Sequence, residues 1–415
     1  MQRSARFGRA KAAVTIAAVL FAAAAAAAAA AAPAADLRYA YAKGEQYRMV
    51  TRVNERVLVN GVHSHQADIL NRIAVRVTDV RDGSGLHDAV FQTSERAVGS
   101  SGSYEWSEDY DSVFWRDARG AFVIDDRYFM PVVRNVPMFP EKPVAPGDTW
   151  SAAGWEVHDF RASFGMPDPF TFPITVAYTY LRNEVRSGID CAVIGISYTV
   201  FQKVTAAPRT SRTYPVRLAG TSRQTLWWDA AAGREVAYTE TFDFLFTLAS
   251  GDEVEYIGEA SGELIEARPL DRAATTAQIR SELERQKIEG ASVRSDDLGV
   301  TITLENVNFQ ANSDALLPTE QEKLRRIATI LKNYPDRDIL ITGHTAGVSG
   351  YTAQQHQELS ELRAKAVGDS LISLGARSAG QITTRGMGAD VPVGDNATEE
   401  GRRRNRRVEI TILEN

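Results

Sequence analysis

Cysteine is almost absent from this sequence, since Cys191 is the only one among 415 residues. An intramolecular disulfide bond is therefore impossible, and hydrophobic cores must stabilise the fold. No cysteine stands directly after the N-terminal apolar segment to carry a lipid, so we expect no lipoprotein anchor there. Cys191 lies in the strand-like run DCAVIGISYTV, where we expect it to be a small buried hydrophobic residue.

An excess of positive charge is also lacking. The formal net charge is −6, which gives no reason to expect nucleic acid as a partner. Hydrophobic residues make up 44% of the chain and charged residues 24%, values that are ordinary for a globular protein able to bury a core. The length indicates two or three domains.

Residues suited to catalysis or metal binding are few and scattered. His63 and His65 share one face of a predicted strand, but two ligands without a third make a weak metal site. His158 and Asp159 are adjacent, with no nucleophile motif nearby. Two acidic pairs in turn-like stretches are interpreted as surface residues (Glu108–Asp109 and Asp125–Asp126). We therefore predict no metal, no cofactor and no enzymatic activity, with a glycan-cleaving carboxylate pair assembled by the fold as the alternative.

The first 35 residues have the parts of a secretory signal peptide. A basic start precedes an alanine-dominated run from Ala12 to Ala32, and small residues then offer a cleavage site after Ala34 or Ala35. A transmembrane anchor is the alternative, which the alanine content and the A-x-A pattern disfavour. We predict that residues 1–35 are a signal peptide and that the mature protein lies in the periplasm or at the outer membrane.

Residues 36–268 are predicted to form an antiparallel all-β domain, either a sandwich or a half-barrel. The stretch NRIAVRVTDVRDGSG alternates apolar and polar residues and stops at a glycine-rich turn. RQTLWWDAAAGREVAYTETFDFLFTL is typical of a hairpin turning at Asp229–Gly233, with Phe242, Phe244 and Phe246 on one face. A membrane β-barrel is the alternative, although proline-rich segments and charged strand faces favour a domain surrounded by water.

Two segments interrupt the expected strand pattern. YEWSEDYDSVFW is acidic and aromatic, and MPVVRNVPMFPEKPVAPGDTW is punctuated by prolines and must be irregular or edge-like. Such aromatic residues usually cover the open end of a sheet, and a ligand cleft is the alternative interpretation.

After residue 268 the pattern changes to alternating strands and helices. A charged helix in residues 269–290 is expected to be a linker or a packing helix that ends at Gly290. Residues 291–415 are predicted as an α/β domain of order βαβαββ, with helices packed on a mixed sheet. Its first helix starts at Pro318 or with a Thr319–Glu322 capping box and ends before Pro335. Its apolar stripe consists of Leu324, Ile327, Ala328 and Leu331.

The next helix, Gln355–Leu374, has an arginine on its predicted apolar side. Arg363 falls about 40° from Leu359 on a helical wheel. The stripe is expected to contain Leu359, Leu362, Ala366, Ser370 and Leu374. Because an unpaired buried charge is costly, Arg363 either reaches the sheet edge or an internal acid, or binds an anionic ligand. Spacing alone leaves both alternatives open.

Four pieces of sequence, in order between Val293 and Leu413, carry a family resemblance: NVNFQANSDALLP, GHT, LSELRAKAV and GRRRNRRVEITI. Together they resemble the C-terminal domain of the OmpA family, the peptidoglycan-binding module of Gram-negative envelope proteins. The resemblance covers roughly the last third of the chain, the length of one domain. It implies non-covalent binding to peptidoglycan, linking it to the outer membrane or to a periplasmic β-domain.

In that family, the Asp of a Gly-His-Thr-Asp motif binds the ammonium of the stem-peptide diamino acid, and an Arg in the next helix binds its carboxylate. Arg363 matches the Arg, but Ala346 occupies the position of the Asp. His356 stands where the family has an Asn at the helix start. The resemblance also implies ligand-binding roles for Thr345, Gly347, Asn405 and Arg407.

The missing Asp leaves three alternatives. Loop carbonyls or Ser349 replace the acceptor, the wall has a different diamino acid, or the domain has given up wall binding. Loss of one charge-assisted hydrogen bond would weaken binding by roughly 10- to 150-fold. The run RRRNRR fits the family's last strand, so a structural or solvated role is favoured over an independent phosphate site.

Overall fold

The computed structural model describes residues 34–158, 169–204, 214–266, 270–305, 307, 316–348 and 350–414. The predicted signal peptide before Ala34 lies outside these residues, as do Asp159 and Ser349. No helix in the described part of the chain is both long and apolar enough to cross a membrane.

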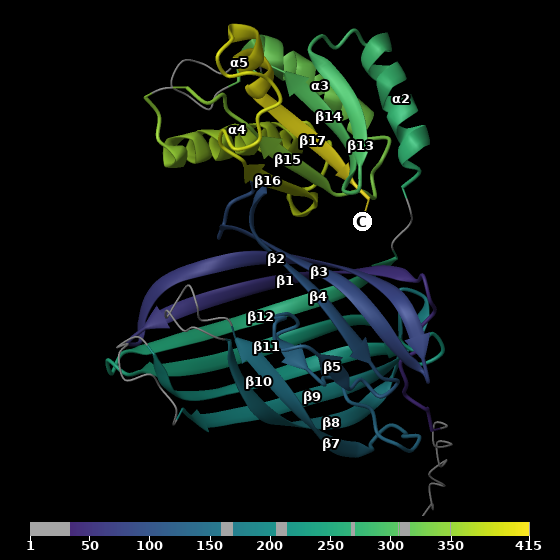
Figure 1. The fold of residues 1–415 in the computed structure, drawn as a ribbon. Helices are drawn as coiled ribbons and strands as arrows, with labels where there is room; N and C mark the ends of the chain where they lie inside the picture. The colour runs from purple at the N-terminus through teal and green to yellow at the C-terminus, as the bar shows by residue number, and fades with distance from the viewer. Residues whose placement is uncertain are drawn as a thin grey trace, which may run out of the picture. The chain divides into compact units, whose positions relative to one another are not determined.

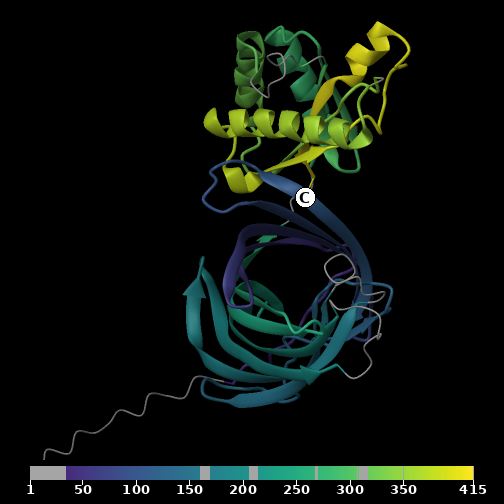
Figure 2. The ribbon, with the colours of Figure 1, turned by 90° about the vertical axis from the view of Figure 1, so that its left-hand side faces the viewer.

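The N-terminal region is all-β, as predicted, and its strands form one continuous antiparallel sheet (Figure 1). The strands are β1 (Gln46–Val59), β2 (Val62–Arg81), β3 (Ser84–Ala97), β4 (Tyr104–Arg116), β5 (Phe122–Ile124), β6 (Val133–Arg134), β7 (Thr149–His158), β8 (Phe170–Arg186), β9 (Ile189–Lys203), β10 (Pro215–Asp229), β11 (Arg234–Leu248) and β12 (Glu253–Glu266). Their order across the sheet is β5-β4-β3-β2-β1-β12-β11-β10-β9-β8-β7-β6. Figure 2 shows that this sheet curls, so that one of its faces is concave.

Local turn chemistry explains the strand order. The turns Asn60–Gly61, Asp82–Gly83 and Ser187–Gly188 have positive φ at both residues, the geometry that joins adjacent antiparallel strands most tightly and that Asn-Gly and Asp-Gly favour. The hairpin predicted around Asp229–Gly233 is confirmed as β10 and β11. The curled face is filled by a core of buried aromatic and aliphatic side chains, including Phe139, Tyr178 and Trp228.

The structure corrects one of the two expected interruptions. YEWSEDYDSVFW lies within β4, which pairs with β3 along nearly its whole length. Its acidic residues alternate with aromatic ones, so the strand keeps a wet and a dry face despite its composition. The proline-punctuated segment is irregular, as predicted, apart from the two-residue strand β6 and the start of β7. Cys191 is buried, as expected.

The C-terminal region is an α/β domain with a mixed sheet (Figure 1). Its elements are α2 (Arg272–Arg285), β13 (Ala291–Asp296), β14 (Gly299–Glu305), α3 (Pro318–Leu331), β15 (Ile339–Gly343), α4 (Ala353–Ser373), a 3₁₀ turn η1 (Ala379–Gln381), β16 (Ile382–Gly386), α5 (Glu399–Asn405) and β17 (Arg407–Leu413). The sheet order is β13-β14-β17-β15-β16, in which only β15 and β16 are parallel. Compared with the predicted βαβαββ order, the structure adds β13 and the short helix α5.

One hydrophobic core joins the helices to a single face of this sheet. Ile302 of β14, Ile341 of β15 and Ile410 of β17 are buried in it. Helix α2 adds Ile279 and Leu283, so it is a packing helix. Helix α3 supplies the predicted stripe of Leu324, Ile327, Ala328 and Leu331. This helix begins with Pro318 at its first position and has no side-chain cap, so the alternative Thr319–Glu322 capping box is wrong.

The buried stripe of α4 differs from the one predicted. Ser360, Ala364, Val367, Gly368 and Leu371 are buried, whereas Leu362 is 50% exposed. The buried face is rich in small residues because the helix lies very close to the ends of β15 and β16: a Cβ atom added to Gly343 or Gly386 would overlap Ser360. A wheel centred on leucines therefore selects the wrong face, and Arg363 lies at the flank of the true stripe.

We predict that Gly343→Ala destabilises the C-terminal domain by about 1–3 kcal/mol, the usual cost of forcing extra volume into a packed interior. All six tryptophans lie between residues 106 and 228, so tryptophan fluorescence follows the β-domain and far-ultraviolet circular dichroism follows the helices of the other domain. In chemical denaturation, Gly343→Ala should lower the denaturant midpoint followed by circular dichroism and leave the midpoint followed by tryptophan fluorescence unchanged. Gly195→Ala is the control, because its added Cβ would meet only the side chain of Leu181, at 3.4 Å. Equal midpoints for Gly343→Ala and the unmodified protein would contradict the proposed close packing.

Candidate functional site

The candidate site is the loop that joins β15 to α4. The loop begins after Gly343, whose backbone packs against the turn of α4 at Ser360. Thr352 caps α4 in a capping box with Gln355. A hydrogen bond of 2.9 Å between Thr345 Oγ1 and His356 Nδ1 ties the loop to the first turn of the helix. Two of the predicted site residues, Thr345 and His356, are thus in direct contact.

The loop is also held by the chain that follows β16. The Thr345 amide donates a hydrogen bond to the carbonyl oxygen of Gly388 (2.8 Å). The Gly388 amide in turn donates to Ser360 Oγ on α4 (2.9 Å). Gly388 has a φ of +49°, a backbone conformation that glycine adopts without strain. Strand ends, loop and helix therefore form one hydrogen-bonded frame.

Arg363 lies one turn along α4 from this frame and is half-buried. Burial lowers the pKa of Arg363, the positive charge of Arg406 acts in the same direction, and Tyr351 acts in the opposite one. The guanidinium thus lies where a second positive charge is close and water is partly excluded. Arg406 is itself paired with Glu399 (2.7 Å), so an approaching carboxylate would be favoured mainly by Arg363, whose guanidinium fork could donate two parallel hydrogen bonds to it.

Position 346, where the family resemblance predicts an acid, is occupied by an alanine that is 4% exposed. The next residue, Gly347, donates its amide hydrogen to Asn396 Oδ1 (3.1 Å). Position 346 therefore provides no side-chain acceptor for an ammonium group. The nearby Asn396 Oδ1 already accepts a hydrogen bond from the Gly347 amide. Ser349, suggested as a substitute acceptor, lies outside the described residues.

Asn405 and Arg407 are placed within the frame of the domain. Asn405 is 0% exposed, accepts hydrogen bonds from the amides of Val393 and Gly394, and donates to the Gly394 carbonyl and to Asn396. Arg407 is also buried and donates to Glu409 and to the Val391 carbonyl. These contacts give both residues a positioning role, and direct ligand contact by either of them stays a prediction.

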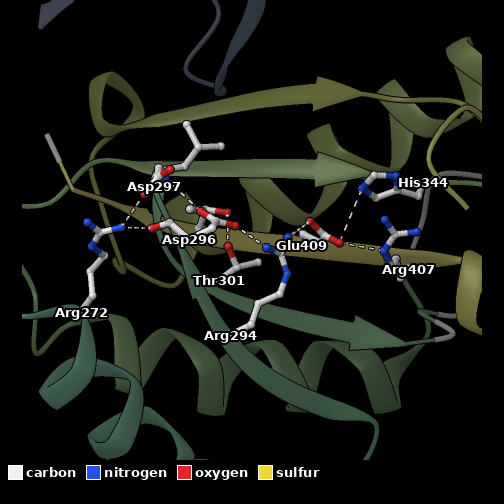
Figure 3. A network of polar contacts seen from close by, with 10 residues as sticks. Arg272, Arg294, Asp296, Asp297, Thr301, His344, Arg407 and Glu409 are labelled. Carbon is white, nitrogen blue, oxygen red and sulfur yellow. Dashed lines mark hydrogen bonds and ion pairs between the residues drawn. The ribbon is translucent and has the colours of Figure 1, made fainter. Parts of the chain in front are cut away.

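A network on the other face of the sheet supports this region (Figure 3). The Glu409 carboxylate accepts from Arg407 Nε (2.8 Å) and from Arg294 on β13 (2.9 Å). His344, the first loop residue, lies with its Nε2 3.9 Å from Glu409. The hydrogen bonds from Arg407 and its charge outweigh the effect of burial, so the pKa of Glu409 is lowered. Sequence reasoning missed Glu409, Arg294, His344 and Asn396, although Glu409 is a polar residue alternating with apolar ones in RRVEITIL.

We predict that His344 stays neutral far below the pH at which histidine usually becomes charged. Burial, followed by the Arg407 charge, lowers the pKa of His344 from its ordinary 6.5 to about 4. The unfolded chain therefore binds more protons between these values, and folding stability falls as the pH drops through that window. Between pH 7 and pH 5 the expected loss from this group is about 2 kcal/mol.

Histidine side-chain NMR measures this directly, with His344→Gln identifying the signal. The His344 resonances should not shift between pH 8 and pH 5, and the helical circular dichroism midpoint of His344→Gln should depend less on pH than that of the unmodified protein. A His344 signal that titrates near pH 6.5 would show that the ring is hydrated and that the network in Figure 3 is open.

The other sequence-predicted polar residues form no comparable site. His63 and His65 are exposed on β2, and within the described ranges no group of three His, Cys, Asp or Glu side chains is placed to hold a metal ion. His158 contacts Glu156 through Nε2 at 2.7 Å, a contact that the sequence did not suggest.

The C-terminal domain is thus of the α/β class with a strand–loop–helix site and an arginine beside the loop. Comparison with known proteins identifies its family: residues 308–406 match the family model described as "OmpA family", so the chain carries an OmpA-family domain.

Three curated relatives illustrate the similarity. Probable lipoprotein YiaD of Escherichia coli K12 is 36% identical over 131 residues, which cover 31% of this chain and 58% of the relative. Outer membrane porin F of Pseudomonas aeruginosa is 36% identical over 107 residues, covering 26% and 30%. Peptidoglycan-binding protein ArfA of Mycobacterium tuberculosis is 39% identical over 108 residues, covering 26% and 32%. The chain therefore spans between 30% and 58% of the length of these relatives.

Proposed function

We propose that this chain is an exported cell-envelope protein whose C-terminal domain binds peptidoglycan non-covalently. The domain would link the wall to the outer membrane, to another envelope protein or to the periplasmic β-domain of the same chain. The OmpA-family match and the similarity to a relative named as peptidoglycan-binding support this function. The families concerned are structural anchors, and we propose no catalytic role.

The placement of Arg363 carries the proposal. Its helical turn packs on Gly343 at the start of the loop, and a second positive charge at Arg406 acts on it. The free carboxylate of a stem-peptide diamino acid would bind the guanidinium. Thr345, Gly347 and His356 would shape the loop around the rest of that group.

Binding should be weak, because Ala346 provides no acceptor for the ammonium of the same diamino acid. We expect backbone carbonyl oxygens of the loop to take over part of this contact. A neutral acceptor stabilises an ammonium less than a carboxylate does, since hydrogen bonds with both partners charged are stronger.

We predict that Ala346→Asp strengthens wall binding by roughly 10- to 150-fold, the effect of about 1.5–3 kcal/mol for one charge-assisted hydrogen bond. Ala346→Asn is the matched control, because it has nearly the same size without the charge and should give a much smaller gain. Arg363→Ala should abolish binding. Arg325→Ala removes a charge from an exposed position on α3 and should leave binding unchanged. Co-sedimentation of the mature protein with purified peptidoglycan from its own source measures all four.

Two outcomes would oppose the proposal. If Arg363→Ala sediments with peptidoglycan as the unmodified protein does, Arg363 is an internal structural ion. If Ala346→Asp and Ala346→Asn are equally weak and both remain folded by circular dichroism, the domain has kept the fold without wall binding.

We further propose that the mature chain begins near Ala35 or Asp36, without a lipid. The backbone of Ala35 exchanges two hydrogen bonds with Val144 (2.8 and 2.9 Å), and Leu37 is part of the β-domain core. Cleavage after Ala34 would retain both contacts. Intact-mass and N-terminal analysis of the exported protein should find this start, and a mature protein that keeps the alanine run would show a membrane anchor instead.

A further inference from the structure

The concave face of the β-domain contains a pocket of about 820 Å³, within the range of about 300–1,000 Å³ found for small-molecule sites. Strands β1, β2, β3, β4, β7, β9, β11 and β12 contribute to its wall, together with residues 129–133. Figure 2 shows the curl of the sheet to which these strands belong. The wall residues of β11 alternate along the strand from 240 to 246, so they share one face.

Most of the wall is apolar. Phe242, Phe244 and Phe246 of β11 line it from one side, and Tyr256 of β12 lies beside them. The proline-punctuated segment adds Phe129, Met130, Val132 and Val133. Aromatic and aliphatic surfaces of this kind favour the body of a hydrophobic molecule because they remove its surface from water.

One end of the pocket holds a carboxylate with an unused acceptor. Glu156 is 1% exposed, and its Oε2 is 2.7 Å from His158 Nε2. No described residue donates to its second oxygen, Oε1, within normal hydrogen-bond geometry, and the Tyr198 hydroxyl is the side-chain group that interacts with the same carboxylate. A buried charged oxygen without a partner costs free energy, so a donor brought by a ligand would be favoured here.

The second carboxylate at this end is satisfied by its neighbours. Glu240 Oε1 accepts from Ser222 Oγ (2.7 Å) and Gln224 Nε2 (3.1 Å). Burial, the negative charges of Glu156 and Glu240 and a side-chain hydrogen bond with Glu156 raise the pKa of the nearby Tyr198, and a side-chain hydrogen bond with Ser222 opposes them. Burial also raises the pKa of Glu240, although the hydrogen bonds from Ser222 and Gln224 oppose it. The local field is therefore negative.

The charge of the whole lining has the same sign. Among the described residues, five glutamates line the pocket, Glu55, Glu95, Glu108, Glu156 and Glu240, together with His158, which contacts Glu156, and the described lining contains no lysine or arginine. Burial and then Glu95 raise the pKa of Glu55 to about 6, which is the expected response of a carboxyl group among like charges. An anionic ligand would be repelled, and a cationic one would be attracted.

We propose that this pocket binds a small hydrophobic molecule with an amine group, whose ammonium donates to Glu156 Oε1 while its apolar body packs on Phe242, Phe244 and Phe246. The ligand class is thus a cationic amphiphile, and the site is independent of the wall-binding loop of the other domain.

Isothermal titration calorimetry of the mature protein with decylamine, decanol and decanoic acid tests the head group at constant chain length. Decylamine should bind once per chain and at least about tenfold more tightly than decanol, the effect of one charge-assisted hydrogen bond. Decanoic acid should bind least. All titrations stay below the concentration at which decylamine forms micelles.

Three variants separate the head from the body of the site. Glu156→Gln should reduce decylamine affinity to that of decanol and leave decanol binding unchanged. Asn71→Trp places a large side chain in the pocket and should abolish the binding of both decylamine and decanol. Glu259→Gln is the control, because Glu259 is exposed on β12 and does not line this pocket. Tryptophan fluorescence during denaturation verifies that each variant remains folded.

Three results would overturn the proposal. These are equal affinities for the amine and the acid, unchanged decylamine binding by a folded Glu156→Gln, and binding that does not saturate or occurs equally in Asn71→Trp. Binding that does not saturate, or that occurs equally in Asn71→Trp, would mean that decylamine adsorbs to the protein surface and does not enter the pocket.

Discussion

The candidate wall site depends on how closely α4 approaches the sheet. Gly343 leaves room for the backbone of Ser360 and Gly386 for its side chain, and the buried stripe of α4 contains small residues such as Ala364 and Gly368. Such close contact leaves the helix little freedom to slide or rotate, because a packed interior tolerates little extra volume. The loop after β15 and the turn that carries Arg363 therefore keep a constant relation to each other, which a two-point ligand clamp requires.

Charge placement follows from the same geometry. Arg407 is buried and must be neutralised, and Glu409 does this while it also pairs with the exposed Arg294 (Figure 3). That arrangement keeps Arg407 within the domain and leaves His344 uncharged. Arg363, on the helix side, is under the influence of Arg406. The domain thus pairs Arg407 internally, whereas Arg363, the proposed carboxylate-binding residue, lies on α4 beside the loop.

Much of the fold could be predicted from the sequence, but only where a local sequence pattern is sufficient to determine a structural feature. Alternation and turn residues predicted the all-β region and the hairpin at Asp229–Gly233, because those signals are local. The stripe of α3 was also predicted correctly, since large aliphatic residues mark it. The stripe of α4 was not, because its buried face consists of small residues chosen for close approach to glycines on distant strands. Such a requirement becomes visible only when both partners are in place.

The pocket of the β-domain shows the same limit more sharply. Glu55, Glu156 and Glu240 belong to three strands far apart in the sequence, and only the curl of the sheet brings them to one cavity. Each glutamate taken alone is an ordinary polar residue of an alternating strand. The segment YEWSEDYDSVFW was expected to cover the open end of a sheet, with a ligand cleft as the alternative, and Glu108 was interpreted as a surface residue. Because the sheet is curved, the two faces of its alternating strands differ: charged side chains on the convex face are solvated, whereas those on the concave face line the pocket. Glu95 and Glu108 keep contact with water, whereas burial raises the pKa of Glu55 and of Glu240. Protonation of these buried carboxyl groups and the proposed bound cation are therefore two ways to lower the repulsion without losing the fold.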